Sequence, residues 1–167
     1  MDPDDPDRYR PWLSCLQADD LSAAPIVPGQ RAVAHDVHEN FGVVIVVDDA
    51  TRELVTVDAV HDGHKWKVIG CGVMTPTDAS WLAAPPLGLR NLGGGGSWGI
   101  AYGEFRYLIL RAAPEIHTVR LITSDRSSER RLQADGFLAL LTVPGEPITY
   151  LQGVDHAGND SGDSLLL

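Results

Sequence analysis

The segment NLGGGGSWGIAYG, residues 91–103, contains residue types used in two kinds of active site. Its GGSWG fits G-x-S-x-G, in which a strained strand-to-helix turn exposes a nucleophilic serine, here Ser97. Acid and base candidates follow in the order found in such hydrolases, with Asp125 or Asp135 before His156. The flanking sequence does not support the turn, because PPLGLRNLG lacks a strand pattern and IAYGEFRYLILRA lacks a helix pattern.

The same glycines fit the G-x-G-x-x-G pattern of a dinucleotide-binding turn through Gly94, Gly96 and Gly99. That turn needs a strand before it and a helix N-terminus after it, so that backbone amides can meet the pyrophosphate. The sequence indicates neither element, and no P-loop lysine follows. We therefore predict a flexible glycine loop and no cofactor.

The predicted loop, residues 88–103, is also a candidate contact surface. Trp98 lies beside the glycine run, and aromatic residues on loops are frequent contact residues for ligands and partners. The competing interpretation is that Trp98 packs as an anchor for the loop. We predict that any contact surface includes Arg90, Asn91 and Trp98, with the edge strand nearest to them.

A second motif, HDGH at residues 61–64, contains an Asp-Gly pair typical of a two-residue type I′ hairpin turn. That turn fixes the register of the two flanking strands. It would set His61 against His64 on one face and Asp58 against Lys67 on the other.

Two imidazoles at His61 and His64 would have Cβ atoms about 5 Å apart. They could hold a metal ion if a carboxylate such as Asp36 or Glu39 joined them. The HDVH motif at residues 35–38 does not add a second pair, because its histidines would point to opposite faces of a strand. The competing interpretation is a hairpin tip whose histidines only flank a turn.

From residue 31 onward the chain has the pattern of short β-strands separated by polar turns. We count about eight or nine strands at intervals of roughly 8–12 residues, which is typical of a β-sandwich. A second Asp-Gly pair, at residues 135–136, predicts another two-residue hairpin that sets Ala134 against Phe137. The predicted fold is all-β, a single immunoglobulin-like β-sandwich with one or two short peripheral helices. The predicted strands are 31–37, 41–47, 54–60, 65–70, 100–112, 117–123, 129–133, 137–143 and 148–154.

The chain has 167 residues and a formal net charge of -10, with 44% hydrophobic and 22% charged residues. This length suits one domain. So acidic a chain repels phosphate backbones and anionic membrane surfaces, so we expect neither nucleic acid nor membranes as partners. Aspartates are concentrated at both ends of the chain. We predict a disordered acidic N-terminus at 1–10, one sandwich domain at 11–154 and a flexible acidic tail at 155–167.

Cys15 and Cys71 do not make a disulfide framework, and we predict two free, partly buried thiols. No basic segment followed by an apolar stretch begins the chain, and no apolar run approaches about 18 residues. These features predict a cytoplasmic location. An ectodomain shortened at its start and given a methionine would have the same pattern.

The C-terminal third resembles uncharacterised immunoglobulin-like β-sandwich domains of high-GC bacteria. The shared pattern is a strand, a polar turn, a strand, a DG turn, an apolar FLA strand, a PG turn and a strand ending in D-x-x-G. The resemblance implies a sandwich fold and carries no catalytic residue. The matching residues are Asp135, Gly136, Phe137, Leu138, Ala139, Pro144, Gly145, Asp155 and Gly158.

No coherent catalytic constellation, phosphate loop or basic patch emerges, so the sequence favours a non-enzymatic interaction module. Its partner is expected to be a protein of unknown identity, and a homo-oligomer is left open. The alternative is a small hydrolase or a metal-binding protein that uses Ser97 or the His61/His64 pair. A third possibility is a small-molecule site under the glycine loop.

Overall fold

The computed structural model describes residues 5–75, 77–78, 80–99, 103–142, 144–145 and 147–167. Among these residues it confirms an all-β sandwich with short helices at the surface. No helix in this part of the chain is both long enough and apolar enough to cross a bilayer. The strands are β1 (Gln30–His38), β2 (Phe41–Asp48), β3 (Glu53–His61), β4 (Trp66–Met74), β5 (Leu89–Gly99), β6 (Gly103–Ala112), β7 (Ile116–Ile122), β8 (Ser127–Arg131), β9 (Phe137–Thr142), β10 (Tyr150–Asp155) and β11 (Asp160–Leu166).

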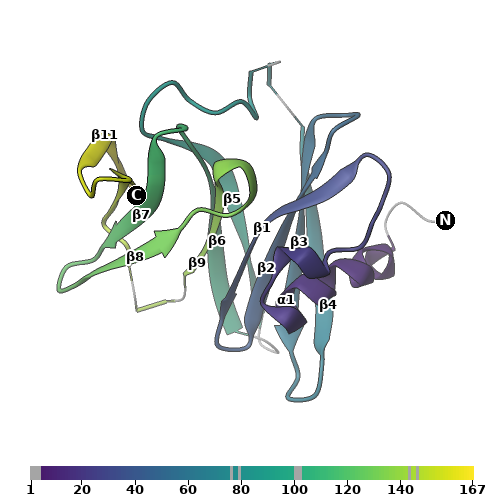
Figure 1. The fold of residues 1–167 in the computed structure, drawn as a ribbon. Helices are drawn as coiled ribbons and strands as arrows, with labels where there is room; N and C mark the ends of the chain where they lie inside the picture. The colour runs from purple at the N-terminus through teal and green to yellow at the C-terminus, as the bar shows by residue number, and fades with distance from the viewer. Residues whose placement is uncertain (1–4, 76, 79, 100–102, 143, 146) are drawn as a thin grey trace.

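The strands form three antiparallel sheets that follow one another across the molecule (Figure 1). Sheet A is the meander β1-β2-β3-β4, sheet B has the order β5-β6-β9, and sheet C has the order β11-β10-β7-β8. Sheet B lies in the middle. The short N-terminal helices η1 (Pro6–Leu13) and α1 (Ser14–Ala18) lie against sheet A on the side away from sheet B.

Strand β2 shows why the sheets stack in this way. Its sequence FGVVIVVD is apolar at successive positions, and successive side chains of a strand point to opposite faces. Val43 and Ile45 are therefore buried in the core between sheets A and B. Val44 and Val46 are buried on the other face, where Trp12 of η1 covers them.

The prediction of a disordered N-terminus at 1–10 is wrong for Pro6 to Arg10, which lie in η1. Asp5 caps this helix, because its side chain accepts a hydrogen bond from the Asp7 amide at 2.9 Å. Tyr9 is only 4% exposed and packs with Trp12 on sheet A. The acidic composition of residues 1–10 therefore gave no indication of the apolar side chains of η1, which are buried only because they pack on sheet A.

The prediction of a flexible tail at 155–167 is also wrong, because the chain forms β11 and pairs with β10. Asp155 closes the turn between these strands. Its Oδ1 accepts hydrogen bonds from the amides of Ala157 (2.8 Å) and Asn159 (2.9 Å). The aspartate that suggested a solvated tail is thus a turn residue.

The second Asp-Gly pair does not form the predicted hairpin between β8 and β9. Strand β8 pairs with β7 in sheet C, whereas β9 pairs with β6 in sheet B, so Ala134 and Phe137 are not opposite one another in a ladder. Asp135 and Gly136 have φ values of 55° and 74°, a left-handed conformation that these residue types tolerate. Here that conformation carries the chain from one sheet to the next.

The two cysteines are both free, as predicted, but only Cys15 is buried. Burial raises the pKa of the Cys15 thiol to about 11, so the reactive thiolate is scarce at neutral pH. We expect a disulfide reagent such as Ellman's reagent to modify one thiol rapidly in the folded protein and two after denaturation. Cys71→Ser should abolish the rapid reaction, and Cys15→Ser should leave it unchanged.

Candidate functional site

The candidate site lies on the face of sheet B that is turned toward sheet C. Along β6 every second side chain points to this face. Leu110 is buried there between the sheets, but Glu104 and Arg106, nearer the start of the strand, are exposed. Sheet C therefore covers only part of this face. The uncovered part is a groove of about 780 Å³, which we call the β5–β6 groove.

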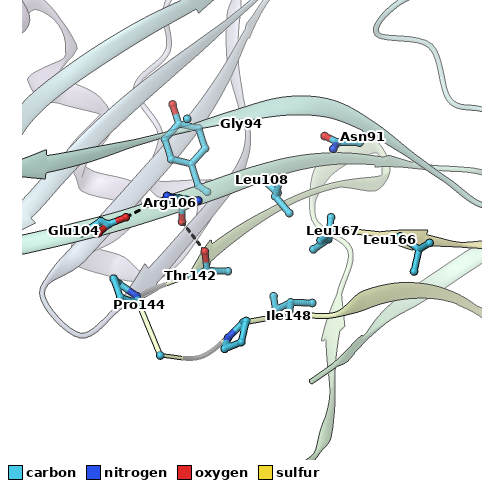
Figure 2. Close-up of a pocket in the computed structure, with 14 residues that line it drawn as sticks. Asn91, Gly94, Glu104, Arg106, Leu108, Thr142, Pro144, Ile148, Leu166 and Leu167 are labelled. Atoms are coloured by element: carbon cyan, nitrogen blue, oxygen red, sulfur yellow. Dashed lines mark hydrogen bonds and ion pairs between the residues drawn. The ribbon is translucent and has the colours of Figure 1, made fainter. Parts of the chain in front are cut away.

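The β5–β6 groove has an apolar middle and a charged end (Figure 2). Leu108, Ile148 and Leu167 gather in its middle, and Leu166 lies beside them. At the other end Arg106 pairs with Glu104 at 3.4 Å. The remaining lining residues are Asn91, Gly94, Gly95, Tyr107, Thr142, Pro144, Gly145 and Pro147.

The glycine run borders the groove as a strand, which corrects the prediction of a flexible loop. Residues 94–96 pair in register with Leu108, Tyr107 and Arg106 of β6. A Cβ atom on Gly94 or Gly96 would overlap the carbonyl oxygen of Tyr107 or Phe105, respectively. The glycines are therefore needed for the close approach of two backbones, rather than for flexibility.

The three predicted contact residues have different surroundings. Asn91 lines the groove, and its Oδ1 accepts a hydrogen bond from the Gly93 amide at 2.8 Å. Arg90 is not a groove residue, because its guanidinium donates to the carbonyl oxygens of Ser80 (3.0 Å) and Ala83 (3.2 Å). The side chain of Trp98 lies outside the described residues, and only its backbone is placed, in β5.

The backbone around Ser97 is that of a strand, not of a strand-to-helix turn. Ser97 pairs with Phe105, and β5 continues to Gly99, while the Ser97 side chain lies outside the described residues. The structural setting of a serine elbow and that of a dinucleotide turn are both missing here. The proposed acid and base residues have other partners. Asp125 accepts a hydrogen bond from Thr123 Oγ1 at 2.9 Å, Asp135 pairs with Arg31, and the ring centroid of His156 lies 4.5 Å from that of His117.

The predicted register of the HDGH hairpin is wrong. His61 pairs with Trp66, so the turn has four residues, 62–65, instead of two. The Asp62 carboxylate stabilises the longer turn by accepting hydrogen bonds from the His64 and Lys65 amides, each at 3.0 Å. Lys67 consequently pairs with Asp62 at 2.5 Å and not with Asp58.

His61 and His64 both line a hollow of about 430 Å³, but they do so beside Arg10 and Lys65. Positive neighbours oppose the binding of a metal cation. The described part of the chain contains no group of three side chains placed to hold a metal ion. The sequence-based metal site therefore gains no support from the arrangement of these residues.

The first two residues of the HDVH motif, His35 and Asp36, connect sheet A to other elements of the fold. The buried His35 ring lies between Asp19, 2.9 Å from its Nε2, and the Gln133 amide, 3.0 Å from its Nδ1. Asp36, proposed as a metal ligand, instead accepts a hydrogen bond from the Leu141 amide of β9 at 2.7 Å. These contacts hold the edge of sheet A against the edge of sheet B.

Sequence reasoning missed a buried polar cluster directly behind the glycine strand. Asp58 is 8% exposed, and its Oδ1 has no hydrogen-bond partner. The Tyr107 hydroxyl donates to Thr56 Oγ1 at 2.9 Å, and a Cβ atom on Gly95 would come within 2.5 Å of that hydroxyl. A β-bulge between β3 and β4 sets Asp58 opposite Gly70. The regular register that the sequence predicted had set Asp58 opposite Lys67.

Burial dominates the electrostatics of this cluster. It raises the pKa of Asp58 to about 7, and the interaction with Tyr107 opposes the shift only in part. Burial and the nearby Asp58 charge raise the pKa of Tyr107 to about 12. The cluster is enclosed in the core between sheets A and B, so we assign it to stability and not to ligand contact.

Fold and groove together define the class of this protein as an all-β sandwich with an open groove beside a glycine-rich strand. In comparisons with protein-family models, curated proteins and solved structures, the chain had no match. Its function must therefore be argued from its own residues.

Proposed function

We propose that this protein is a non-enzymatic binding module that holds an extended, apolar peptide segment of a partner protein in the β5–β6 groove. One observation carries the proposal. Leu166 is 83% exposed and Leu167 is 49% exposed, and both line the same groove as Leu108 and Ile148. Exposed apolar residues that converge on one concave surface are typical of binding sites.

An extended peptide suits this groove better than a compact ligand. Gly94 and Gly95 present backbone without side chains along one wall. Among the described residues β5 pairs only with β6, so its other edge is available for backbone hydrogen bonds to a ligand. The exposed Arg106–Glu104 pair favours a ligand whose apolar side chains are followed by a charged one.

The net charge of the chain favours a protein partner over nucleic acids and anionic membranes. With a net charge of -10, the chain repels nucleic acid and anionic membranes. A second copy of this chain is one form that the partner could take. A cytoplasmic location is part of the proposal and is tested by fractionating cells that express the full chain.

The hydrolase and metal-binding alternatives have no observation in their favour beyond their motifs. A fluorophosphonate probe that labels Ser97, with loss of labelling in Ser97→Ala, would establish the hydrolase. A zinc-dependent rise in melting temperature that is lost in His61→Ala would establish the metal site.

The groove is tested with a matched pair of exposed leucines. Leu166 lies in the groove, whereas Leu87, 62% exposed, does not line it. We would select peptides of about 12 residues from a displayed library and measure their dissociation constants by calorimetry. Leu166→Asp is expected to weaken binding at least tenfold, since burying a leucine side chain is worth about 1.5–3 kcal/mol.

Leu87→Asp should leave the affinity unchanged. Peptides that bind both variants equally, or a library from which no apolar peptide is enriched, would contradict the proposal. Sedimentation of the protein alone tests the second-copy form, because Leu166→Asp would then dissociate an oligomer that Leu87→Asp leaves intact.

A further inference from the structure

The hollow of about 430 Å³ that His61 and His64 line lies between the N-terminal helices and the turn that joins β3 to β4. We call it the basic hollow, because Arg10 of η1 and Lys65 of the turn both line it. It shares no lining residue with the β5–β6 groove. The other lining residues are Pro11, Leu13, Ser14, Gln17 and Trp66.

The positive charges of the basic hollow are not offset by neighbouring carboxylates. Among the described residues no carboxylate lines the hollow, and neither Arg10 nor Lys65 forms an ion pair. The carboxylate of Asp62, in the turn, accepts two backbone hydrogen bonds and pairs with Lys67 at 2.5 Å, so it is already engaged. Arg10 and Lys65 therefore leave this hollow positively charged in a chain whose net charge is -10.

Neutral hydrogen-bond donors accompany these charges. The Gly63 amide donates to His61 Nδ1 at 3.2 Å, so the neutral imidazole carries its proton on Nε2 and can donate from that atom. The side-chain amide of Gln17 also lines the hollow, and it has no hydrogen-bond partner in the described part of the chain. Positive groups and neutral donors on one concave surface are what an anionic group needs for binding.

Trp66 gives the basic hollow an aromatic wall. Its ring is half-buried, and the His61 ring meets it edge-on with the centroids 5.1 Å apart. A Cβ atom on Gly42 of β2 would come within 3.1 Å of Trp66 Cζ3, so a glycine there lets the indole lie close to the sheet. A half-exposed indole held in this way offers surface on which a flat apolar group can pack.

We propose that the basic hollow binds a small aromatic anion, in which a carboxylate or phosphate group is attached to a planar ring. Arg10 and Lys65 pair with the anionic group, and the ring packs on Trp66. A small anion suits the hollow better than a nucleic acid, because a long polyanion would also meet the acidic remainder of the chain. The positive charge that opposes a metal ion beside His61 and His64 thus favours an anion at the same place.

The test is an NMR titration of the isotope-labelled full chain with phenyl phosphate and, separately, with benzoate, at constant ionic strength. At least one of them is expected to give saturable shifts at residues 10–17 and 61–66, with a dissociation constant in the millimolar range. Benzyl alcohol has the ring without the charge, and inorganic phosphate has the charge without the ring. Each should bind about tenfold more weakly than the preferred aromatic anion.

Charge-removing variants locate the site. Arg10→Gln and Lys65→Gln should each weaken binding about threefold, and the double variant about tenfold. Both positions are exposed, and the Lys65 backbone amide still donates to Asp62, so we expect these variants to fold. Arg131→Gln, on the exposed strand β8 outside the hollow, is the matched control and should bind like the wild type.

Saturation by phenyl phosphate alone or by benzoate alone supports the proposal and identifies which anionic group the hollow prefers. The proposal is overturned if neither saturates below about 50 mM, or if the double variant binds like the wild type. It is also overturned if benzylamine, which carries the ring with a positive charge, binds as tightly as the anions. Leu166→Asp should leave anion binding intact, so a failure of the groove proposal is distinguishable from a failure of this one.

Discussion

Asp58→Asn is expected to raise the free energy of unfolding by about 3 kcal/mol at pH 8. A pKa shift of about three units represents roughly 4 kcal/mol, and we expect the substitution to recover the larger part of it. The wild-type side chain is a carboxyl enclosed between sheets A and B, with one oxygen unpartnered. Asparagine has nearly the same shape and remains neutral. A melting temperature about 6–12 °C higher at pH 8 should accompany the change.

The sign of the pH dependence follows from where the proton is held. Burial raises the pKa of Asp58 from 3.8 to about 7. Between these values the folded carboxyl keeps a proton that the unfolded chain has released, so stability falls as the pH rises. The contribution of the neutral carboxyl to the free energy of unfolding is fully present below about pH 4 and is lost once the pH passes about 7.

Urea denaturation from about pH 5 to about pH 8 checks this prediction. The gain from Asp58→Asn should be smallest at the acid end, should grow as the pH rises to about 7 and should level off above that value. Asp163→Asn, at an exposed position, is the control and should follow the wild-type curve. A gain that does not change with pH would show that Asp58 is not the titrating group.

Gly94→Ala is expected to destabilise the fold by about 3 kcal/mol, because the added methyl group would overlap the Tyr107 carbonyl oxygen. The clash is with backbone in the middle of sheet B, so no side chain can rotate to relieve it. The melting temperature should fall by about 6–12 °C. If the glycines formed a flexible loop, the same substitution would be close to neutral.

Gly70→Ala is the matched control for this substitution. Gly70 also lies in a strand, but the nearest atom to an added Cβ would be Asp58 Oδ2 at 3.6 Å, an ordinary contact. We expect a change of less than about 1 kcal/mol. Thermal denaturation of both variants distinguishes a packed glycine strand from a flexible glycine loop. Equal melting temperatures would rule out the packed strand.

The two predictions concern neighbouring parts of one structure. Gly95 leaves room for the Tyr107 hydroxyl, and that hydroxyl reaches Thr56 beside Asp58. Asp58 does not line the β5–β6 groove. Asp58→Asn is therefore a stabilised background in which the peptide-binding variants can be measured.

The sequence by itself determined the fold class and most of the strands. In β1, β2 and β3 the apolar residues follow patterns that only half-buried or fully buried strands satisfy, and the structure has strands at these positions. It also predicted that both cysteines are free thiols. These features depend on local pattern, which sequence reasoning can read directly.

Tertiary structure alone decided the features that depend on a distant neighbour. The glycine run resembles a loop locally, yet it is a strand because β6 approaches it too closely for any side chain. Leu166 became a groove residue because β11 pairs with β10 and brings the end of the chain beside sheet B.

The same holds for the turns and for the arginine side chains that line one surface hollow. An Asp-Gly pair favours a left-handed turn, but the partner strand decides whether that turn closes a hairpin or moves the chain to another sheet. Arg31, Arg52 and Arg111 are scattered over 81 positions and meet only where the ends of β1, β2 and β6 converge. Local preference determines the elements, whereas packing between elements decides which side chains share a site, because their separation in space is independent of their separation along the chain.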